Sequence, residues 1–378
     1  GFFIAAGCPL SVEMNKDKWP LIPDVKKLTE YIQESLSENE KYNLLIEELI
    51  KAGKNNENIE DILSFIRGLE QVSKGGEVRG LSNKDLIDLE KEVCKLIVDK
   101  MDVKLPNHKT PYHKLVKWIS SIDREIPIEI FTTNYDVLME QALEDIEVPY
   151  FDGFVGTLKS FFDLRAIEDN LIPKHWTRLW KVHGSINWYQ ETRDDQTYVY
   201  RTNIDKNNDS HLIYPSHLKY DQSRKMPYLA LIDQLSHFIK KKSSILIISG
   251  YSFNDDHLNN TIINSLKSNP TAMVLALMNG KHKFKNGDNN FIERYPKAYK
   301  HANKQHNLNI WSKDRAVIGT IEGKWEKGEN VEESGLLTFI ETKQNSAGAV
   351  PDQTLVKIED FSLFTDFLVS LIGNENDE

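Results

Sequence analysis

The sequence predicts an α/β fold in which a mainly parallel sheet carries a helical insert and a C-terminal appended subdomain. Five short apolar runs have the composition of fully buried strands, and helical patterns separate them. Small or polar residues follow four of these runs directly, as at the ligand-binding edge of an open parallel sheet. The expected strands lie at residues 2–6, 126–131, 179–182, 244–249 and 271–277.

The composition is that of an ordinary globular protein. Of 378 residues, 40% are hydrophobic and 28% are charged, which is enough apolar material for a large core. A net charge of −10 gives no general attraction to a polyanion, so we expect no direct nucleic-acid binding. Since no run approaches the 20 apolar residues of a membrane span, we expect a soluble cytoplasmic protein. The sequence begins at Gly1 without Met, so we expect its natural start to be missing.

The first expected strand ends in small residues. Ala5, Ala6 and Gly7 would let the backbone approach a pyrophosphate, and a helix behind this turn would add free N–H groups and a favourable dipole. Cys8 and Ser11 belong to the same turn. A strand-to-helix turn without any ligand explains the same pattern.

Residues 22–122 are predicted to form a helical insert. Apolar residues recur there at helical spacing, as at Leu28, Ile32 and Leu36. The loops between the expected helices are polar, and no cluster of reactive side chains stands out. We therefore assign no chemistry to the insert.

Two further strands end in polar groups. Thr133 and Asn134 follow the second strand, and a helix is expected from Tyr135, so that Asn134 either binds a ligand or caps this helix. His183 follows the third strand. Histidine transfers protons near neutral pH, but a satisfied core histidine would fit the same position.

The fourth strand leads into Gly250, Tyr251 and Ser252, with Asp255 and His257 at the start of the next helix. Capping of this helix by Asn254 or Asp255 would explain the acidic start without a ligand. After Met278 the pattern changes to loops, to strand-like segments at 336–341 and 354–358, and to an apolar helix at 361–372. Residues 281–378 are therefore predicted to form a separate subdomain that could serve assembly.

The cysteines limit the metal chemistry of the chain. Cys8 and Cys94 are the two cysteines present, and no Cys-x-x-Cys pair occurs. This excludes a disulfide framework and a four-cysteine zinc site. Asp255 and Asp256 are adjacent but have no obvious third ligand, so we expect no bound metal.

Together, these motifs resemble the sirtuin family, and within it the sirtuin-like NADase branch of prokaryotic anti-phage defence. The family pattern is GAG-x-S at the first turn, T-x-N-x-D after a middle strand, H-G at a strand end and G-x-S after a late strand. Its counterparts here are residues 5–7, 132–136, 183–184 and 250–252, and the longer Gly-Tyr-Ser-Phe-x-Asp-x-His form at 250–257 is similar to the defence branch. The chain departs from the pattern where Ala5 replaces the first glycine and Pro9 or Ser11 stands for the serine.

The resemblance implies a Rossmann-like catalytic domain at residues 1–280 that uses NAD as its substrate. It implies catalytic roles for Asn134, Asp136 and His183: Asn134 would orient the ribose hydroxyls or the attacking water, Asp136 would support Asn134 or the nicotinamide side, and His183 would be the general base. The residues that it implies in NAD binding are Ala5, Ala6, Gly7, Cys8, Ser11, Thr133, Gly250, Tyr251, Ser252, Asp255 and His257.

The implied activity is hydrolysis of NAD to nicotinamide and ADP-ribose. Because the zinc module of the deacetylases is missing, we do not expect an acetyl-lysine substrate. A sensor that binds NAD or ADP-ribose without hydrolysis and a DNA-cleaving defence subunit are the alternatives. Members of this branch work in assemblies, so we expect a homo-oligomer; a HerA-type ATPase would be a separate subunit, because the sequence contains no P-loop.

Overall fold

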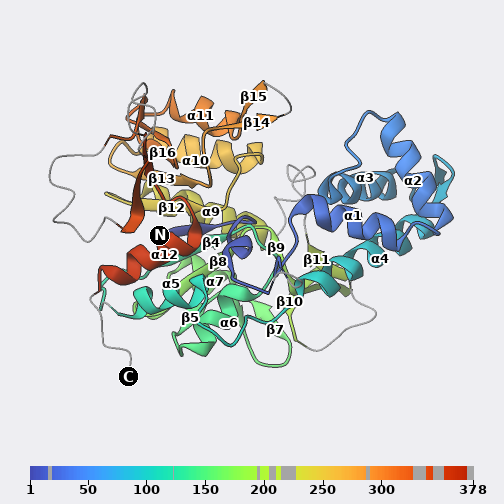
Figure 1. Ribbon diagram of the computed structural model, residues 1–378. Coiled ribbons are helices and arrows are strands. Elements are labelled where there is room, and N and C mark those ends of the chain that lie inside the picture. Colours follow the sequence, from blue (N-terminus) through green and yellow to red (C-terminus); the bar gives the residue numbers. More distant parts are fainter. Residues whose placement is uncertain are drawn as a thin grey trace.

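A computed structural model (Figure 1) describes the chain except for residues 16–18, 122, 194–195, 204–209, 214–226, 287–289, 327–337, 344–352 and 373–378. A nine-stranded sheet lies at its centre, with the strand order β18-β17-β16-β13-β12-β1-β4-β8-β5. The strands are β1 (Phe2–Ile4), β4 (Glu129–Thr132), β5 (Tyr150–Phe151), β8 (Thr177–Lys181), β12 (Ile245–Ser249), β13 (Met273–Met278), β16 (Leu308–Ser312), β17 (Arg315–Ile318) and β18 (Ile321–Lys324).

The sheet is doubly wound. From β1 the chain continues to β4 and β8 on one side of the first strand, and later to β12, β13 and β16 on its other side. All these neighbours pair in parallel, whereas β17 and β18 at one edge are antiparallel. The predicted mainly parallel sheet is confirmed, and all five predicted strands belong to it. Its switch point lies between β1 and β12, where a ligand crevice is expected outside the strand carboxyl ends.

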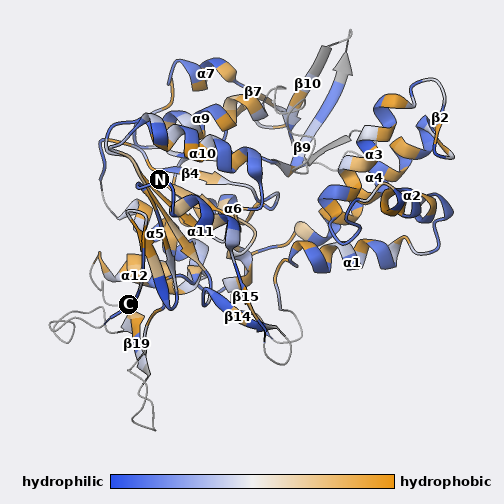
Figure 2. Cartoon of the chain, turned by 90° about the horizontal axis from the view of Figure 1, so that it is seen from above, coloured by the Kyte–Doolittle hydropathy of each residue, from blue (hydrophilic) through white to orange (hydrophobic). Residues whose placement is uncertain are grey.

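Helices cover both faces of the sheet, which is why its central strands are apolar on both sides. The helices α9 (Tyr228–Lys240), α10 (Asp256–Ser268) and α11 (Pro296–Ala302) share one core with Phe3. On the other face, α5 (Pro111–Ser120), α6 (Leu138–Asp145) and α12 (Phe361–Ser370) pack with Phe2 and Ile4. Figure 2 shows the apolar colour of the strands enclosed between these helices.

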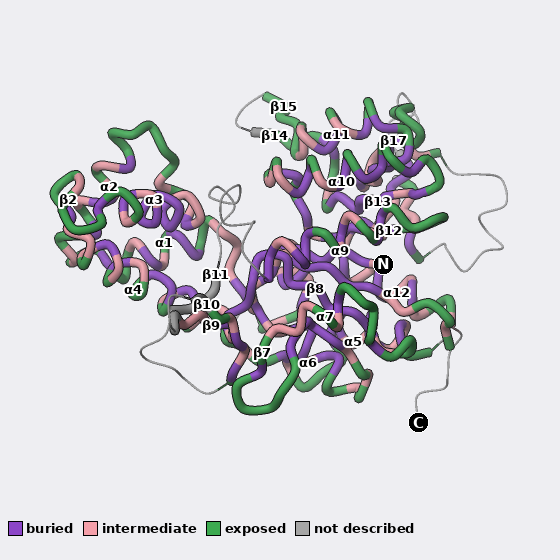
Figure 3. Tube along the Cα trace, turned by 180° about the vertical axis from the view of Figure 1, so that it is seen from behind, coloured by how far each residue is buried: buried purple, intermediate pink, exposed green. Residues whose placement is uncertain are grey.

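Four helices of the predicted insert form a lobe with its own core, visible beside the main body in Figures 1 and 3. They are α1 (Val25–Ser35), α2 (Glu40–Lys51), α3 (Ile59–Val72) and α4 (Asn83–Met101), with a hairpin of β2 (Glu77–Val78) and β3 (Leu81–Ser82). The fifth helix of this region, α5, packs on the sheet instead. Tyr135, Val137 and Ile186 contact the lobe's core, so the insert touches the segments that follow β4 and β8.

A second, antiparallel sheet of five strands has the order β11-β9-β10-β7-β6. Its strands are β6 (Phe154–Val155), β7 (Ser160–Phe162), β9 (Gly184–Arg193), β10 (Gln196–Arg201) and β11 (Ser210–Ile213), and the short helix α7 (Leu164–Glu168) follows β7. The sequence analysis did not predict this sheet. Its longest strand, β9, begins directly after His183 and therefore anchors one end of the candidate site.

The central sheet continues beyond the domain boundary that the sequence suggested near residue 280. The strand β16 pairs with β13 in parallel, and β17 and β18 extend the same sheet. Two hairpins lie outside it, β14 (Lys283–Asn286) with β15 (Asn290–Glu293) and β19 (Ile340–Lys343) with β20 (Gln353–Val356). Of the helices in the described part of the chain, none has the length and apolar character needed to span a bilayer.

Candidate functional site at the switch point of the sheet

The four motif segments meet at the carboxyl edge of the central sheet. The chain of contacts runs from Ala5 to Asn134, from Tyr135 to His183, from His183 to Asp255, and back from Gly250 to the first turn. Each segment follows a different parallel strand, so the fold alone brings them to one edge. The structure thus places together residues that are up to 250 positions apart.

The first turn packs directly against the turn after β12. The N–H of Gly7 donates to the carbonyl of Gly250 at 3.0 Å. A Cβ on Gly7 would lie 2.8 Å from Cα of Gly250, and a Cβ on Gly250 would lie 2.7 Å from the backbone N of Cys8. Gly250 also has a φ of +72°, which side chains other than glycine rarely adopt. The two glycines are therefore required for the close approach of the two turns.

The first turn does not form the phosphate cradle that the sequence suggested. Instead of a long helix, a four-residue 3-10 helix (Cys8–Ser11) follows β1. The N–H groups of Ala5, Gly7 and Cys8 all donate within the protein, to Ser249, Gly250 and Ala5 respectively. These N–H groups cannot also donate to a pyrophosphate, and contact with a ligand would fall mainly to the exposed Ala6.

Asn134 lies beneath this turn. Its Nδ2 donates to the carbonyl of Ala5 at 3.4 Å, and its backbone N–H donates to Oγ1 of Thr132 at 3.0 Å. The side-chain oxygen Oδ1 is buried and has no hydrogen-bond partner among the described residues. Because α6 begins at Leu138 with Val137 as its N-cap, Asn134 does not cap this helix. The explanation of Asn134 as a cap of this helix is therefore wrong, and its amide lies close to the buried hydroxyl of Tyr112.

Asp136 belongs to a buried polar cluster behind Asn134. One carboxylate oxygen accepts from the N–H of Leu138 at 3.1 Å. Lys181, which is only 1% exposed, donates from Nζ to the carbonyl of Asp136 and at 2.9 Å to Oε1 of Glu140. Burial raises the pKa of Asp136 to about 6, although the Lys181 ammonium works against this rise. The cluster fixes the loop that carries Asn134.

His183, which follows β8, pairs with Asp255, which belongs to the segment after β12. Its Nε2 lies 3.3 Å from Oδ2 of Asp255, and both side chains are more than nine-tenths buried. The ring of Tyr135 lies beside that of His183, with 6.4 Å between the ring centroids. The imidazole is thus held between two segments at the sheet edge, with a carboxylate against one of its nitrogens.

The segment from Gly250 to His257 divides into core and surface residues. Tyr251 packs against Phe3 and Phe253, and its hydroxyl donates to Oδ1 of Asn259 at 2.9 Å. Ser252 is exposed. The carboxylate of Asp255 caps α10 by accepting from the N–H of His257 at 3.0 Å, which confirms the capping role that the sequence offered for Asp255. Tyr251 therefore belongs to the core on which this turn packs, and it stabilises the turn.

The remaining candidates differ in their exposure. Thr133 is half-buried at the edge. The thiol of Cys8 is fully buried, and burial raises its pKa to about 12, so it is not a reactive thiolate. The hydroxyl of Ser11 donates to the carbonyl of Cys8 at 2.7 Å and so closes the 3-10 turn.

Sequence reasoning missed Lys181, Glu140, Tyr112 and Glu60. Lys181 stands in an apolar strand two residues before His183, and a lysine in a buried strand is a signal that could have been noticed. Tyr112 of α5 is buried close enough to Asp136, Cys8 and Glu140 for their negative charges to add to the rise of its pKa that burial causes. Glu60 of α3 accepts from the hydroxyl of Tyr135 at 3.5 Å, which links the insert to the site.

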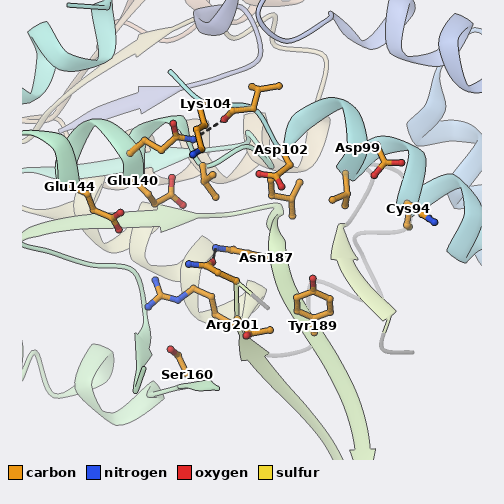
Figure 4. A pocket seen from close by; sticks show the side chains of 18 of the residues that line it. Cys94, Asp99, Asp102, Lys104, Glu140, Glu144, Ser160, Asn187, Tyr189 and Arg201 are labelled. Carbon is orange, nitrogen blue, oxygen red and sulfur yellow. Dashed lines mark hydrogen bonds between the residues drawn. The ribbon is translucent and has the colours of Figure 1, made fainter. Parts of the chain in front are cut away.

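A separate cavity of about 1320 Å³ lies between α4, α6 and the second sheet (Figure 4). Its lining includes many charged residues of both signs, and none of the candidate residues lies in it. Glu140 lines this cavity, and its Oε1 accepts from Lys181. The motif residues lie instead at the switch-point edge, where open parallel sheets bind their ligands, so this edge is the candidate site.

No group of three or more His, Cys, Asp or Glu side chains that could hold a metal ion is found among the residues that the structure describes. Cys8 and Cys94 lie in different hydrophobic cores, one below the first turn and one in the insert. They cannot ligate one metal together.

Comparison with known protein families fits this geometry. Residues 128–307 match the family model of the SIR2-like domain. The match supports a sirtuin-like family, whose domains bind NAD, and it covers slightly less than half of the chain. It includes Asn134, His183 and Asp255 but not the first turn or the insert. No curated protein matched the chain.

Proposed function

We propose that this chain is an NAD glycohydrolase that cleaves NAD to nicotinamide and ADP-ribose. The observation that carries the proposal is that Asn134 and the His183–Asp255 pair follow parallel strands of one sheet at its switch-point edge, inside the SIR2-like match. An unpartnered amide oxygen and a buried imidazole are the groups that can orient a ribose and accept a proton.

The proposed reaction breaks the bond between C1′ of the ribose and the nicotinamide nitrogen. The electron pair of this bond neutralises the positive pyridinium nitrogen, so the leaving group needs no protonation. Water forms the new bond to C1′, and its proton passes to His183. Asn134 would orient the ribose hydroxyls or the water, and Asp136 would hold the loop of Asn134. The enzyme then has to position the reactants and stabilise an oxocarbenium-like ribose.

Hydrolysis, and not deacetylation, is proposed because no thiolate zinc module can form. Cys8 and Cys94 are both buried, in separate cores. We expect metal analysis of the purified protein to find no stoichiometric zinc bound through thiolates. Zinc bound in that way would contradict this part of the proposal.

A role in anti-phage defence follows from the resemblance of residues 250–257 to the defence branch of sirtuin-like NADases. In that setting the chain would act within an oligomer or with a separate HerA-type ATPase. The insert lobe supports this part of the proposal, because it touches Tyr135 beside the site and so could transmit assembly to it.

The proposal is tested by incubating the protein with NAD and quantifying nicotinamide and ADP-ribose by chromatography, with NAD binding measured in parallel. We expect the two products in equal amounts. NAD binding without product release, under every assembly condition tried, would instead support a non-hydrolysing NAD or ADP-ribose sensor.

A further inference from the structure

Lys181 is a charged side chain that the fold buries almost completely. It is the last residue of β8, is only 1% exposed and stands two positions before His183. Its ammonium donates to the backbone carbonyl of Asp136 and, at 2.9 Å, to Oε1 of Glu140. Because a buried ammonium is costly unless polar partners replace water, both oxygens stabilise it.

The carbonyl of Asp136 belongs to the loop of residues 133–137, which joins β4 to α6. The first carbonyl that accepts from α6 is that of Val137, from the N–H of Gln141 at 3.0 Å. The helix therefore begins one residue too late to supply a donor to the carbonyl of Asp136, and Lys181 donates to it instead. A buried backbone carbonyl needs such a partner.

The segment around His183 holds the same loop at two further points. The N–H of Val182 donates to the carbonyl of Thr132, and the N–H of Ile186 donates to the carbonyl of Tyr135, each at 2.9 Å. These two hydrogen bonds are made by the backbone on either side of His183. The third, from Lys181, depends on a side chain and can be removed by substitution.

We propose that Lys181 is a positioning residue, which sets Asn134 relative to His183 by holding the carbonyl of Asp136. Since β8 carries Lys181 and leads directly to His183, one strand both places the imidazole and holds the loop of the amide. A misplacement of about 1 Å can lower an enzymatic rate on the order of a hundredfold. The catalytic part of this proposal rests on the proposed function.

Glu140→Gln and Lys181→Met separate this role from that of a buried ion pair. Each variant leaves one buried charge without its counter-ion, so we expect each to lower the Tm by about 5 °C or more. In Glu140→Gln a side-chain oxygen remains, and the ammonium still donates to the carbonyl of Asp136. Methionine donates no hydrogen bond, so Lys181→Met alone releases the loop.

The double variant, Lys181→Met with Glu140→Gln, contains neither charge. Because no unpaired charge is then buried, its Tm should lie above that of Lys181→Met. The carbonyl of Asp136 still lacks its donor, so the loop should stay released. The double variant also provides the test if Lys181→Met alone does not fold.

The first readout is the side-chain amide ¹H–¹⁵N signals of Asn134 in the full chain without NAD, assigned by comparison with Asn134→Ala. We expect these signals to shift in Lys181→Met and in the double variant, and to stay close to their wild-type positions in Glu140→Gln. Wild-type signals in a folded chain that lacks Lys181, or equal shifts in Glu140→Gln, would overturn the proposal. This readout needs no turnover, so its failure is distinct from failure of the proposed function.

The second readout is steady-state NAD hydrolysis. We expect kcat to fall at least about tenfold in Lys181→Met and in the double variant, with KM changed less than about threefold. The kcat of Glu140→Gln should stay within about threefold of the wild-type value although its Tm is lowered. If kcat instead recovered with the Tm in the double variant, Lys181 would serve only the ion pair and the proposal would be wrong.

Discussion

Among single residues, Asn134 and Asn269 show that equal burial can serve different purposes. Both are 8% exposed. Asn269 donates from Nδ2 to the carbonyls of Ile239 and Lys241, each at 2.8 Å, and so ties the end of α9 to the end of α10. Asn134 leaves its Oδ1 without a partner in the described structure. The first is a structural amide, and the second is the one that we propose binds the ligand.

We expect Asn134→Ala to reduce NAD hydrolysis about a hundredfold or more, because a positioning group is lost. Its Tm should stay near the wild-type value, since the hydrogen bond from Nδ2 to the carbonyl of Ala5 is long, at 3.4 Å. Activity assays combined with thermal unfolding measure both effects.

Asn269→Ala is the control for this experiment. It should lower the stability by about 1–3 kcal/mol, because buried carbonyls lose their donors, while the folded protein keeps its specific activity. If Asn134→Ala behaved as this control does, Asn134 would be a core residue.

The buried carboxyl of Asp136 gives a pH dependence with a definite sign. Burial raises its pKa from 3.8 to about 6, so the folded chain binds this proton more tightly than the unfolded chain does. The contribution of Asp136 to stability therefore falls as the pH rises from about 4 to about 6, and it is constant above that range.

Asp136→Asn removes this contribution. We expect the variant to gain on the order of 2 kcal/mol relative to the wild type between pH 4 and pH 6, as measured by denaturant unfolding. Because the two proteins share all other titrating groups, the contributions of those groups cancel in the difference between the two stabilities. A stability difference that does not change over this range would show that Asp136 is not a destabilised buried carboxylate.

The sequence could suggest candidate residues where one strand end carries its own signal, as at Asn134 and His183, and their roles stay predictions. The Lys181–Glu140 pair was not predictable, because the lysine comes from β8 and the glutamate from α6. Only the packing of that helix on the sheet shows that they meet. The sequence could not show that the N–H groups of the first turn already donate within the protein. Two of their acceptors lie on β12 and the turn after it, far away in the sequence.

Among the elements, the turns after β1 and β12 are coupled by Gly250. We expect Gly250→Ala to destabilise the protein by at least about 2 kcal/mol in denaturant unfolding. Its Cβ would lie 2.7–2.8 Å from backbone atoms of Cys8 and Ala5, in addition to the strain of a positive φ.

Gly53→Ala measures the backbone part of this effect alone, so its difference from Gly250→Ala gives the steric part. Gly53 has a φ of +70°, close to the +72° of Gly250, but a Cβ there would meet no atom within 4 Å. This control should cost about 1 kcal/mol, from the backbone alone. Equal losses in the two variants would mean that the contact between the turns is unimportant for stability.

The elements that were predicted correctly are those with strong periodicity. The five central strands are continuous apolar runs, and α9 (Tyr228–Lys240) and α12 (Phe361–Ser370) lie close to the predicted helices. The second sheet was missed because β9 and β10 are rich in polar residues. The strand β16 was missed because Leu308–Ser312 alternates polar with apolar residues although it is buried inside a parallel sheet.

For the whole molecule, the arrangement of the insert suggests how activity could be controlled. The lobe of α1–α4 has its own core and reaches the site through Glu60 and Tyr135. We expect NAD hydrolysis to be weak in the isolated chain and to rise on assembly, because a partner that binds the competent state preferentially would shift the chain toward that state.

The test of this prediction compares turnover per chain across protein concentrations and in the native complex, with the oligomeric state measured by light scattering. Turnover should rise as assemblies form. High turnover by a stable monomer, independent of concentration, would show that assembly has no such role.

The central claim is that the switch-point edge hydrolyses NAD through His183, and nicotinamide release by His183→Ala tests it most directly. The matched control is His282→Ala, which removes another buried histidine, 3% exposed and packed on Tyr299, that belongs to none of the four motif segments. We expect release in the wild type and in the folded His282→Ala protein, and a loss of about a hundredfold or more in His183→Ala with its fold intact. Wild-type release rates in a folded His183→Ala protein would contradict the account.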